Sequence, residues 1–349
     1  MPAWHTYPVE EFRRQALHWD RLNSRLGGVP FLQSSFIASA LKWFGDGKEL
    51  LAVHDGPMGI DAMALLTLRG RGKWQTFQPS QLPLGACLVA PGVSVEETMR
   101  ELLARLPGLG LVLGFTQQDP QLLKRPDETG SLKTLDYIQT AWVEVDAPFD
   151  DYWAKRGKNL RQNMKRQRAK LDNEGIKTQL EIVTDPTEVA EAIRDYGALE
   201  SAGWKADRGT AVHPDNAQGK FYREVFEEFC ARGDARIFRY RLDGRVAAMD
   251  LCLENGPLHV VLKTTYDESV RTLSLSSLMR QEIFRILFAS QRTRRIEFYG
   301  KLMEWHTRWT DKARTLYHVN SYRWPFLKTI QGLRDRQAAP EKRVQERAE

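Results

Sequence analysis

The stretch ARIFRYRLDGRVAAMDLCLENGPLHVVLKTTYD, residues 235–267, contains three runs of strand-forming residues separated by two short turns. The turns contain Asp243-Gly244 and Asn255-Gly256, and both pairs favour the positive backbone angles that two-residue hairpins require. The stretch therefore predicts a three-stranded antiparallel meander. Directly after it, residues 275–289 carry apolar side chains at helical spacing, which predicts a helix that follows the third strand.

An alternation of strands and helices extends on both sides of this meander. In the second half of the chain we expect strands at 177–185, 294–300 and 315–324 and helices at 186–202 and 215–232. The first half has a similar order, with helices expected at 8–24, 34–44 and 95–105 and strands within 50–68 and at 83–90, 109–115 and 136–146. The sequence therefore predicts an α/β fold.

Length and composition limit the class of protein. A chain of 349 residues exceeds what one hydrophobic core usually holds, so two domains are expected. Three scattered cysteines indicate a reducing compartment, and with no signal-like N-terminus we expect a cytoplasmic protein. No apolar run approaches the roughly 20 residues of a membrane span. Seven dispersed histidines without an HExxH or CxxC motif predict that no metal is bound.

Four stretches between residues 159 and 309 have a composition that points to a site. They are NLRQNMKRQRAKL (159–171), LESAGWKADRGTA (199–211), LKTTYD (262–267) with its following loop, and EFYGKLMEWHTRW (297–309). In this order they resemble the CelD-like (BioF2-like) acyltransferase domain of the GNAT superfamily, which is related to the Fem-type tandem GNAT peptidyltransferases. The likeness covers about half of the chain.

The resemblance implies tandem GNAT-like domains, each a mixed, mostly antiparallel sheet flanked by helices. We expect a divergent N-terminal domain at 1–147 and basic connecting helices at 148–175. The acyltransferase domain is expected at 176–326, and a polar tail at 327–349.

The loop between the third meander strand and the next helix is the expected donor site. In GNAT enzymes this loop holds the pyrophosphate of acyl-CoA, because free N–H groups and the helix dipole attract phosphate. The family pattern has Gln or Arg, then Gly at +3 and Gly or Ala at +5. Here Arg271, Ser274 and Ser276 stand at those places, and Leu275 and Ser277 complete the expected cofactor-binding set. The alternative is a helix start capped by serine with no ligand.

The end of the third strand offers two candidate catalytic residues. The resemblance places Tyr266 near the thioester, where a phenol could protonate the leaving thiolate. Asp267 could orient the attacking amine or hydroxyl. The alternative is an aromatic residue that ends a strand, followed by an aspartate that starts a turn. Lys263 could reach the same pocket or face solvent.

The stretch 297–309 departs from the family at two positions. CelD-like proteins tend to have Tyr-Lys where this chain has Trp305-His306, and the lysine of related peptidyltransferases is thought to stabilise an oxyanion. His306 could do so while protonated, or could act as a general base, or could merely cap a loop. Trp305 could form a substrate platform or pack in the core.

Two further regions could contact substrates. Glu200, Trp204 and Lys205 lie at a helix end that suits recognition of the acceptor, although the segment could also be a lid. Residues 152–171 contain eight cations and no acid, which exceeds the net charge of +6 of the whole chain. This basic segment could point at a phosphorylated ligand, contact tRNA or an anionic surface, or be solvated beside acids from elsewhere.

These features predict an N- or O-acyltransferase that moves an acyl group from acyl-CoA or acetyl-CoA to an amine or hydroxyl. The resemblance suggests a small-molecule, sugar or cell-envelope precursor as the acceptor. The alternatives are a Fem-type transferase that uses aminoacyl-tRNA, and a catalytically inactive GNAT-like binding protein. The sequence leaves the oligomeric state open.

Overall fold

The computed structural model describes residues 3–202 and 212–332, which fall into two compact units. The first unit takes its described residues from 3–28, 45–138 and 315–332, and the second takes them from 29–44, 139–202 and 212–314. The units therefore interleave along the sequence, whereas the expected domains at 1–147 and 176–326 are contiguous.

The first unit is a mixed, mostly antiparallel sheet flanked by helices. Its strands have the order β1-β2-β3-β4-β6-β13-β7, with β5 paired to β3. β4 and β6 pair in parallel, and β1–β2, β2–β3, β3–β4 and β6–β13 pair antiparallel. The elements are β1 (Ala3–Pro8), α1 (Ala16–Arg25), β2 (Leu50–Gly56), β3 (Gly59–Leu68), β4 (Lys73–Thr76), β5 (Cys87–Val89), α3 (Val95–Arg105), β6 (Val112–Gln118), β7 (Leu132–Glu144) and β13 (Ala313–Tyr322).

The second unit contains the predicted meander at the centre of its sheet. The strand order is β7-β12-β11-β10-β9-β8, in which β11 and β12 pair in parallel and the other pairs are antiparallel. The strands are β8 (Thr178–Val183), β9 (Ala235–Leu242), β10 (Arg245–Asn255), β11 (Leu258–Tyr266), β12 (Arg295–Glu297) and the second half of β7. The helices are α2 (Ser34–Phe44), α4 (Phe149–Ala154), α5 (Lys158–Asn173), α6 (Val189–Ala202), α7 (Ala217–Ala231), α8 (Leu275–Ala289) and α9 (Glu304–Thr307).

The first hairpin turn of the meander has the predicted backbone geometry, with φ of 47° at Asp243 and 82° at Gly244. The second turn differs, because Asn255 still pairs with Leu258 and only Gly256 has a positive φ, of 55°. The register between β10 and β11 shifts between Leu251 and Cys252, so one extra residue of β11 bulges out of the ladder. A bulge leaves a peptide group unpaired and turns the following side chains to the opposite face of the sheet. It therefore determines which residues at the end of β11 face α8.

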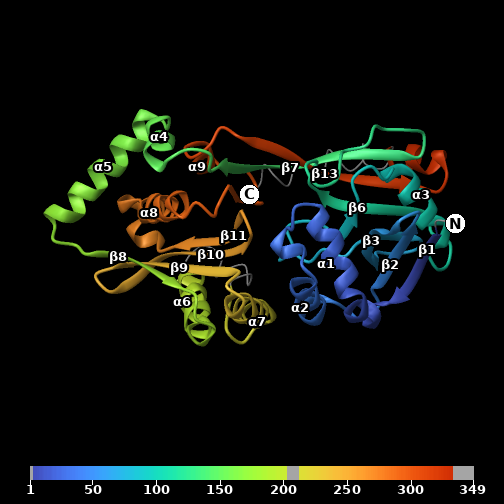
Figure 1. Cartoon of the computed structure of the whole chain (residues 1–349), viewed down its shortest axis with the longest axis horizontal. Helices are drawn as coiled ribbons and strands as arrows, with labels where there is room; N and C mark the ends of the chain where they lie inside the picture. Colours follow the sequence, from blue (N-terminus) through green and yellow to red (C-terminus); the bar gives the residue numbers. More distant parts are fainter. Residues whose placement is uncertain (1–2, 203–211, 333–349) are drawn as a thin grey trace. The chain divides into compact units, whose positions relative to one another are not determined.

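Helices cover both faces of the second sheet. α8 with α4 and α5 lies on one side, and α6 with α7 lies on the other (Figure 1). α2 packs on α7, where the Glu224 carboxylate accepts hydrogen bonds from Ser39 (3.0 Å) and Trp43 (3.1 Å). These contacts explain why residues 29–44 belong to this unit although they lie in the first half of the sequence.

The helix predicted at 275–289 forms with the expected bounds, but its buried face differs at one position. Leu275, Leu278 and Met279 are buried as expected. Ile286, which the apolar pattern also places inside, is 36% exposed, and Phe284 and Phe288 are buried instead. The two aromatic rings pack against Tyr152 of α4, so the position of α4 decides which face of α8 is covered.

Candidate active site

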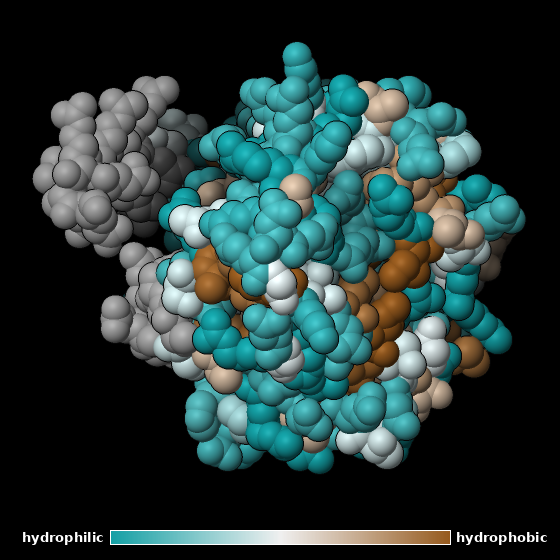
Figure 2. All heavy atoms as spheres, turned by 90° about the vertical axis from the view of Figure 1, so that its left-hand side faces the viewer, coloured by the Kyte–Doolittle hydropathy of each residue, from teal (hydrophilic) through white to brown (hydrophobic). Residues whose placement is uncertain are grey.

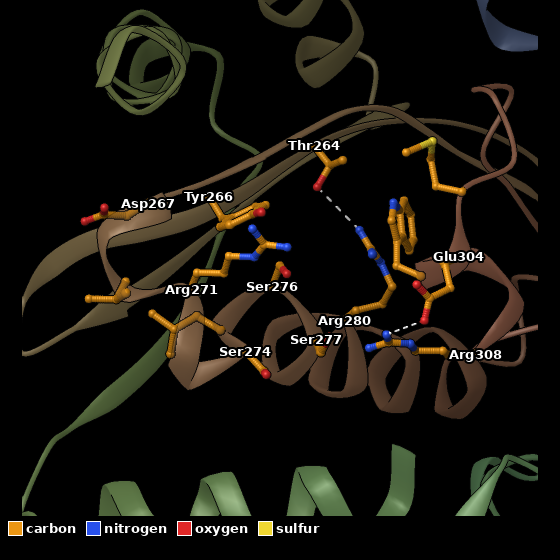
Figure 3. A pocket seen from close by; sticks show the side chains of 14 residues that line it. Thr264, Tyr266, Asp267, Arg271, Ser274, Ser276, Ser277, Arg280, Glu304 and Arg308 are labelled. Atoms are coloured by element: carbon orange, nitrogen blue, oxygen red, sulfur yellow. Dashed lines mark hydrogen bonds and ion pairs between the residues drawn. The ribbon is translucent and has the colours of Figure 1, made fainter. Parts of the chain in front are cut away.

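A cavity of ≈ 410 Å³ lies where the end of β11, the start of α8 and α9 meet (Figure 3). β11 and β12 pair only through residues 258–260 and 295–297, and the following N–H of Phe298 bonds to the carbonyl of Ala141 instead. The two strands therefore separate beyond this point. The cavity is lined by Thr264, Tyr266, Asp267, Val270, Arg271, Ser274, Leu275, Ser276, Ser277, Arg280, Met303, Glu304, Trp305 and Arg308.

The N-terminus of α8 forms one wall of this cavity. Ser274 precedes the helix in the left-handed region, with φ of 53° and ψ of 36°, and its carbonyl accepts the N–H groups of Ser277 and Leu278. The N–H groups of Leu275 and Ser276 have no acceptor among the described residues. Free N–H groups at a helix start bind anions, so this wall has the chemistry expected of a phosphate site.

Arg271 and Ser276 add polar side chains to the same wall. In Figure 3 both point into the cavity, whereas Ser274 points towards α5. Arg271 is exposed and forms no ion pair with any residue that the structure describes. Ser276 stands at the position where the family has a small residue, and its helical backbone does not require glycine. The strained position is Ser274, three residues after Arg271.

The basic helix α5 supports this loop with neutral side chains. Asn163 donates a hydrogen bond to Ser274 Oγ (3.4 Å), and Gln167 donates one to the carbonyl of Thr272 (3.0 Å). Arg168 pairs with Glu282 of α8 (2.5 Å). Thus α5 holds the loop and α8 in place. Five exposed cations of the segment are not paired with any acid in the described part of the chain: Lys155, Lys158, Arg161, Lys165 and Arg166. Figure 2 looks at the side on which α4 and α5 are drawn, and that surface is mainly hydrophilic.

The two candidate residues at the end of β11 differ in their contacts. Tyr266 lines the cavity, and its hydroxyl makes no hydrogen bond to any described residue. Asp267 caps the following turn, accepting bonds from the Ser269 N–H (2.9 Å) and hydroxyl (2.6 Å), and it pairs with Arg245 (3.1 Å). The Ser269 hydrogen bonds, together with Arg245, lower the pKa of Asp267. Asp267 therefore acts as a turn cap, as the structural alternative proposed.

His306 is buried and serves as a cap of α9. Its Nδ1 accepts the N–H of Met303 (2.9 Å), so the neutral ring carries its proton on Nε2. Burial and the nearby charge of Arg280 lower the pKa of His306 to about 4. A neutral ring cannot supply the positive charge suggested for this position, and its Nδ1 lone pair is already occupied. His306 also does not line the cavity, so we do not carry it forward as a catalytic residue.

Trp305 lies between the capping histidine and the cavity. Its ring stacks on His306, with centroids 3.5 Å apart, and packs edge-on against Phe298 at 5.4 Å. Its other contact is the guanidinium of Arg280, which lies 4.2 Å from the ring centroid. Trp305 thus packs against its neighbours and also lines the cavity, and its role as a substrate platform stays a prediction.

Arg280 is the principal residue of the cavity that the sequence motifs missed. It is 3% exposed, and its Nη2 donates to Asp250 Oδ2 (3.1 Å) and Thr264 Oγ1 (3.4 Å). A signal was present in the sequence, because Asp250 is a lone acid within the apolar run AAMDLCL (247–253) of a central strand. A buried acid requires a cationic or hydrogen-bonding partner. Sequence alone could not say which cation that was.

Two of the expected acceptor-binding residues, Lys263 and Glu200, lie on the α6 side of the sheet, away from the cavity. Lys263 points to the α6 side of the sheet, where its Nζ lies 3.3 Å from Glu200 Oε1 and above the ring of Tyr222. The neighbouring Thr264 and Tyr266 face the cavity on the α8 side, as strand alternation requires. Lys263 and Glu200 therefore form a buried ion pair and do not line the cavity. Trp204 and Lys205 lie outside the described residues.

Two features that other functions would need, a metal-binding cluster and a membrane-spanning helix, are not found among the described residues. Within 3–202 and 212–332, no group of three or more His, Cys, Asp or Glu side chains could hold a metal ion. Over the same residues, none of the helices is both long enough and apolar enough to span a membrane. The three cysteines are buried free thiols.

The fold and the cavity define an α/β protein with a candidate ligand site at the N-terminus of a helix that follows a central strand. Residues 158–307 match the family described as an acetyltransferase (GNAT) domain. This match confirms the predicted resemblance to the GNAT superfamily over these residues, and the two sheets described above confirm the predicted fold class. No curated protein gives a significant match.

Solved structures share this fold over most of the chain. One is the C-terminal domain of a protein described as a lysylphosphatidylglycerol synthetase from Agrobacterium fabrum, with 13% identity, a TM-score of 0.57 and coverage of 95% of this chain and 96% of that one. FemX has 10% identity, a TM-score of 0.56 and coverage of 89% and 97%. L-PGS from Bacillus licheniformis has 13% identity, a TM-score of 0.51 and coverage of 87% and 91%. At these identities the likeness shows the fold alone.

Proposed function

We propose that the protein is an N- or O-acyltransferase that takes its acyl group from acyl-CoA. The observation that carries this proposal is the N-terminal wall of α8. It presents the N–H groups of Leu275 and Ser276, the Ser276 hydroxyl and the guanidinium of Arg271 to one cavity. These groups suit a pyrophosphate, which is anionic and accepts many hydrogen bonds.

The chemistry proposed for this cavity is direct transfer without a covalent enzyme intermediate. The acceptor amine or hydroxyl attacks the thioester carbonyl, and the departing thiolate takes a proton from Tyr266. Tyr266 fits this role because its hydroxyl is at the cavity and has no hydrogen-bond partner among the described residues. A small-molecule, sugar or cell-envelope precursor is the proposed acceptor, and the cytoplasm is the proposed compartment.

Calorimetry with CoA, acetyl-CoA and a longer acyl-CoA tests the donor. We expect binding at micromolar to millimolar Kd, or about −8 to −4 kcal/mol. Ser276→Gly should preserve or tighten binding, whereas Ser276→Glu should abolish it, because a carboxylate at the helix N-terminus repels the pyrophosphate. If none of the three ligands releases or absorbs heat with the wild type or with Ser276→Gly, acyl-CoA is not the donor.

The role of Tyr266 is tested by Tyr266→Phe, which keeps the ring and removes only the hydroxyl. Loss of general acid catalysis should lower the transfer rate by about 10²–10⁴ without changing the unfolding temperature. An unchanged rate would show that another group protonates the thiolate. Binding of acyl-CoA without turnover of any amine or alcohol tested would favour an inactive GNAT-like binding protein.

A second candidate, transfer from aminoacyl-tRNA, is favoured by the basic helix. The five cations named above are exposed or half-buried on α5 and its approach, and no described acid pairs with them. If they bind tRNA, log Kd should vary with log salt by about 0.7–0.9 per neutralised phosphate. Replacing Arg161, Lys165 and Arg166 by Gln should reduce that slope. Absence of tRNA binding at low salt would remove this candidate.

A further inference from the structure

The hydrogen-bond donors of Arg280 are incompletely used. A guanidinium carries five N–H donors. Among the described residues, Arg280 donates hydrogen bonds only to Asp250 and Thr264, and all of these bonds come from Nη2. Nε is buried and Nη1 is not, and neither nitrogen donates to any residue in the described part of the chain. Buried donors are nearly always satisfied in native proteins, so the unused edge of this guanidinium indicates an acceptor that a ligand supplies.

The guanidinium is also held in one orientation. Both carboxylate oxygens of Asp250 face Nη2, at 3.4 and 3.1 Å, and the ring of Trp305 covers one face at 4.2 Å. In Figure 3 the Arg280 side chain extends from α8 across the cavity towards Thr264. A donor fixed before the ligand arrives loses little entropy on binding, and it needs no reorganisation during a reaction.

The charges around Arg280 indicate what kind of acceptor fits. Asp250 already neutralises the guanidinium, since both side chains are almost fully buried and 3.1 Å apart. A second carboxylate would have to lose its water beside the first one, which is costly. Glu304 is paired with Arg308, and His306 is neutral at physiological pH. The unused edge therefore suits an oxygen that is neutral when the ligand binds and gains negative charge only during the reaction, better than it suits a carboxylate.

We propose that Arg280 donates a hydrogen bond to the carbonyl oxygen of the bound thioester and stabilises the oxyanion that forms on it. This inference rests on the proposed acyl transfer. The lone pair of the amine or hydroxyl forms the new bond to the carbonyl carbon, and the π electrons move to the oxygen facing Arg280. On collapse the C–S bond breaks and its electrons leave with sulfur. The acceptor loses one proton and the thiolate gains one, giving an amide or ester and free CoA.

Two ligands that differ only in the carbonyl oxygen test this proposal. Acetyl-CoA has the oxygen, whereas S-ethyl-CoA, a thioether, has a methylene in its place. We expect wild-type protein to bind acetyl-CoA about tenfold or more tightly than S-ethyl-CoA, the effect expected of a hydrogen bond from a charged donor. In Arg280→Met this preference should fall to near one, while S-ethyl-CoA keeps its affinity because Arg271 and the α8 N-terminus are unchanged.

Two further variants serve as controls, one for misfolding and one for a general loss of positive charge at the cavity. Arg280→Met leaves Asp250 buried without its partner, so the double variant Arg280→Met with Asp250→Asn provides a neutral pair and should also show no preference. Arg308→Met removes another arginine of the same cavity, one that is exposed and paired with Glu304, and should keep the wild-type preference. Both measurements use the full chain and isothermal calorimetry.

The outcomes separate the two proposals. If wild-type protein binds both ligands equally, or if the two Arg280 variants retain the preference for acetyl-CoA, Arg280 does not contact the carbonyl and acyl-CoA remains the donor. If wild-type protein binds neither ligand, the proposed donor itself is wrong and the role of Arg280 is rejected with it.

Discussion

Arg271 and Arg280 line the same cavity but differ in almost every physical property. Arg271 lies on the loop before α8, is exposed and has no ion-pair partner among the described residues. Arg280 lies inside α8, is 3% exposed, pairs with Asp250 and stacks on Trp305. One cation is solvated, and the other lost most of its water when the protein folded.

Because of this difference, we expect Arg271 to contribute to ligand binding and Arg280 to contribute to the stability of the fold. A solvated arginine keeps its hydration until an anion arrives, so its removal should weaken ligand binding and leave folding unchanged. A buried arginine is tied to its counter-ion, so removal of either partner leaves an uncompensated charge in the interior. Removal of Arg271 should therefore affect ligand binding, and removal of Arg280 or its partner should affect stability. The four experiments that follow are ordered from the largest expected effect to the smallest.

Breaking the buried pair should have the largest effect. We expect Asp250→Ala to lower the free energy of unfolding by about 3–5 kcal/mol, because Arg280 would remain buried without its counter-ion. Urea unfolding followed by circular dichroism measures this change. Arg271→Ala is the matched control, and it should change the same quantity by less than about 0.5 kcal/mol. Equal effects of the two variants would contradict the contrast between the arginines.

The stability of the protein should depend on pH because of His306, whose pKa is lowered by burial and by the charge of Arg280. The pKa of this ring is about 4 in the folded protein against 6.5 for a free histidine, because burial and Arg280 disfavour the charged ring. Between these values the unfolded chain binds more protons, so His306 favours folding fully above pH 6.5 and ever less as pH falls towards 4. The loss should reach about 3 kcal/mol at the acid end.

Urea unfolding at several values between pH 4.5 and 7.5 measures this His306 effect. His306→Asn is the control, since its amide oxygen can still accept the Met303 N–H but does not titrate. The difference in unfolding free energy between wild type and control should shrink as pH falls. A difference independent of pH would show that His306 titrates alike in the folded and unfolded chain.

Removing the exposed arginine should weaken donor binding only. We expect Arg271→Gln to raise the Kd for CoA about tenfold, the size of one charge-assisted hydrogen bond to phosphate. Calorimetry in low and moderate salt measures this, and the wild-type affinity should be the more sensitive to salt. Dephospho-CoA serves as a control for contacts to the 3′-phosphate. An unchanged Kd would place the phosphates away from Arg271.

The smallest effects concern the two serines of the loop. Ser274 has φ of 53°, so Ser274→Gly should relieve strain and raise the free energy of unfolding by about 0.5–1 kcal/mol, less whatever the Asn163 hydrogen bond contributes. Ser276 lies within α8, and Ser276→Gly should lower it by about 0.5 kcal/mol. Thermal unfolding of both variants checks the opposite signs. Two changes of the same sign would contradict the backbone assignment.

Much of the second unit could be predicted from local sequence. Asp243-Gly244 and Gly256 mark the two turns of the meander, because few other residues accept the positive backbone angles found there. The helix at 275–289 and the loop with Arg271 and Ser276 followed from the same local signals. What failed was the assignment of side chains to one site. Lys263 turned to the opposite face of the sheet, His306 became a buried cap, and Glu200 paired with Lys263.

By itself, the sequence determined the elements, their order and the presence of a helix N-terminus with a cation before it, because these depend on interactions between near neighbours. Only the tertiary structure decided that Arg280, Asp250 and Trp305 meet, since they come from α8, a central strand and the distant α9. It also decided that α2 joins the second unit. Burial and desolvation depend on all surrounding elements at once, and no local pattern records them.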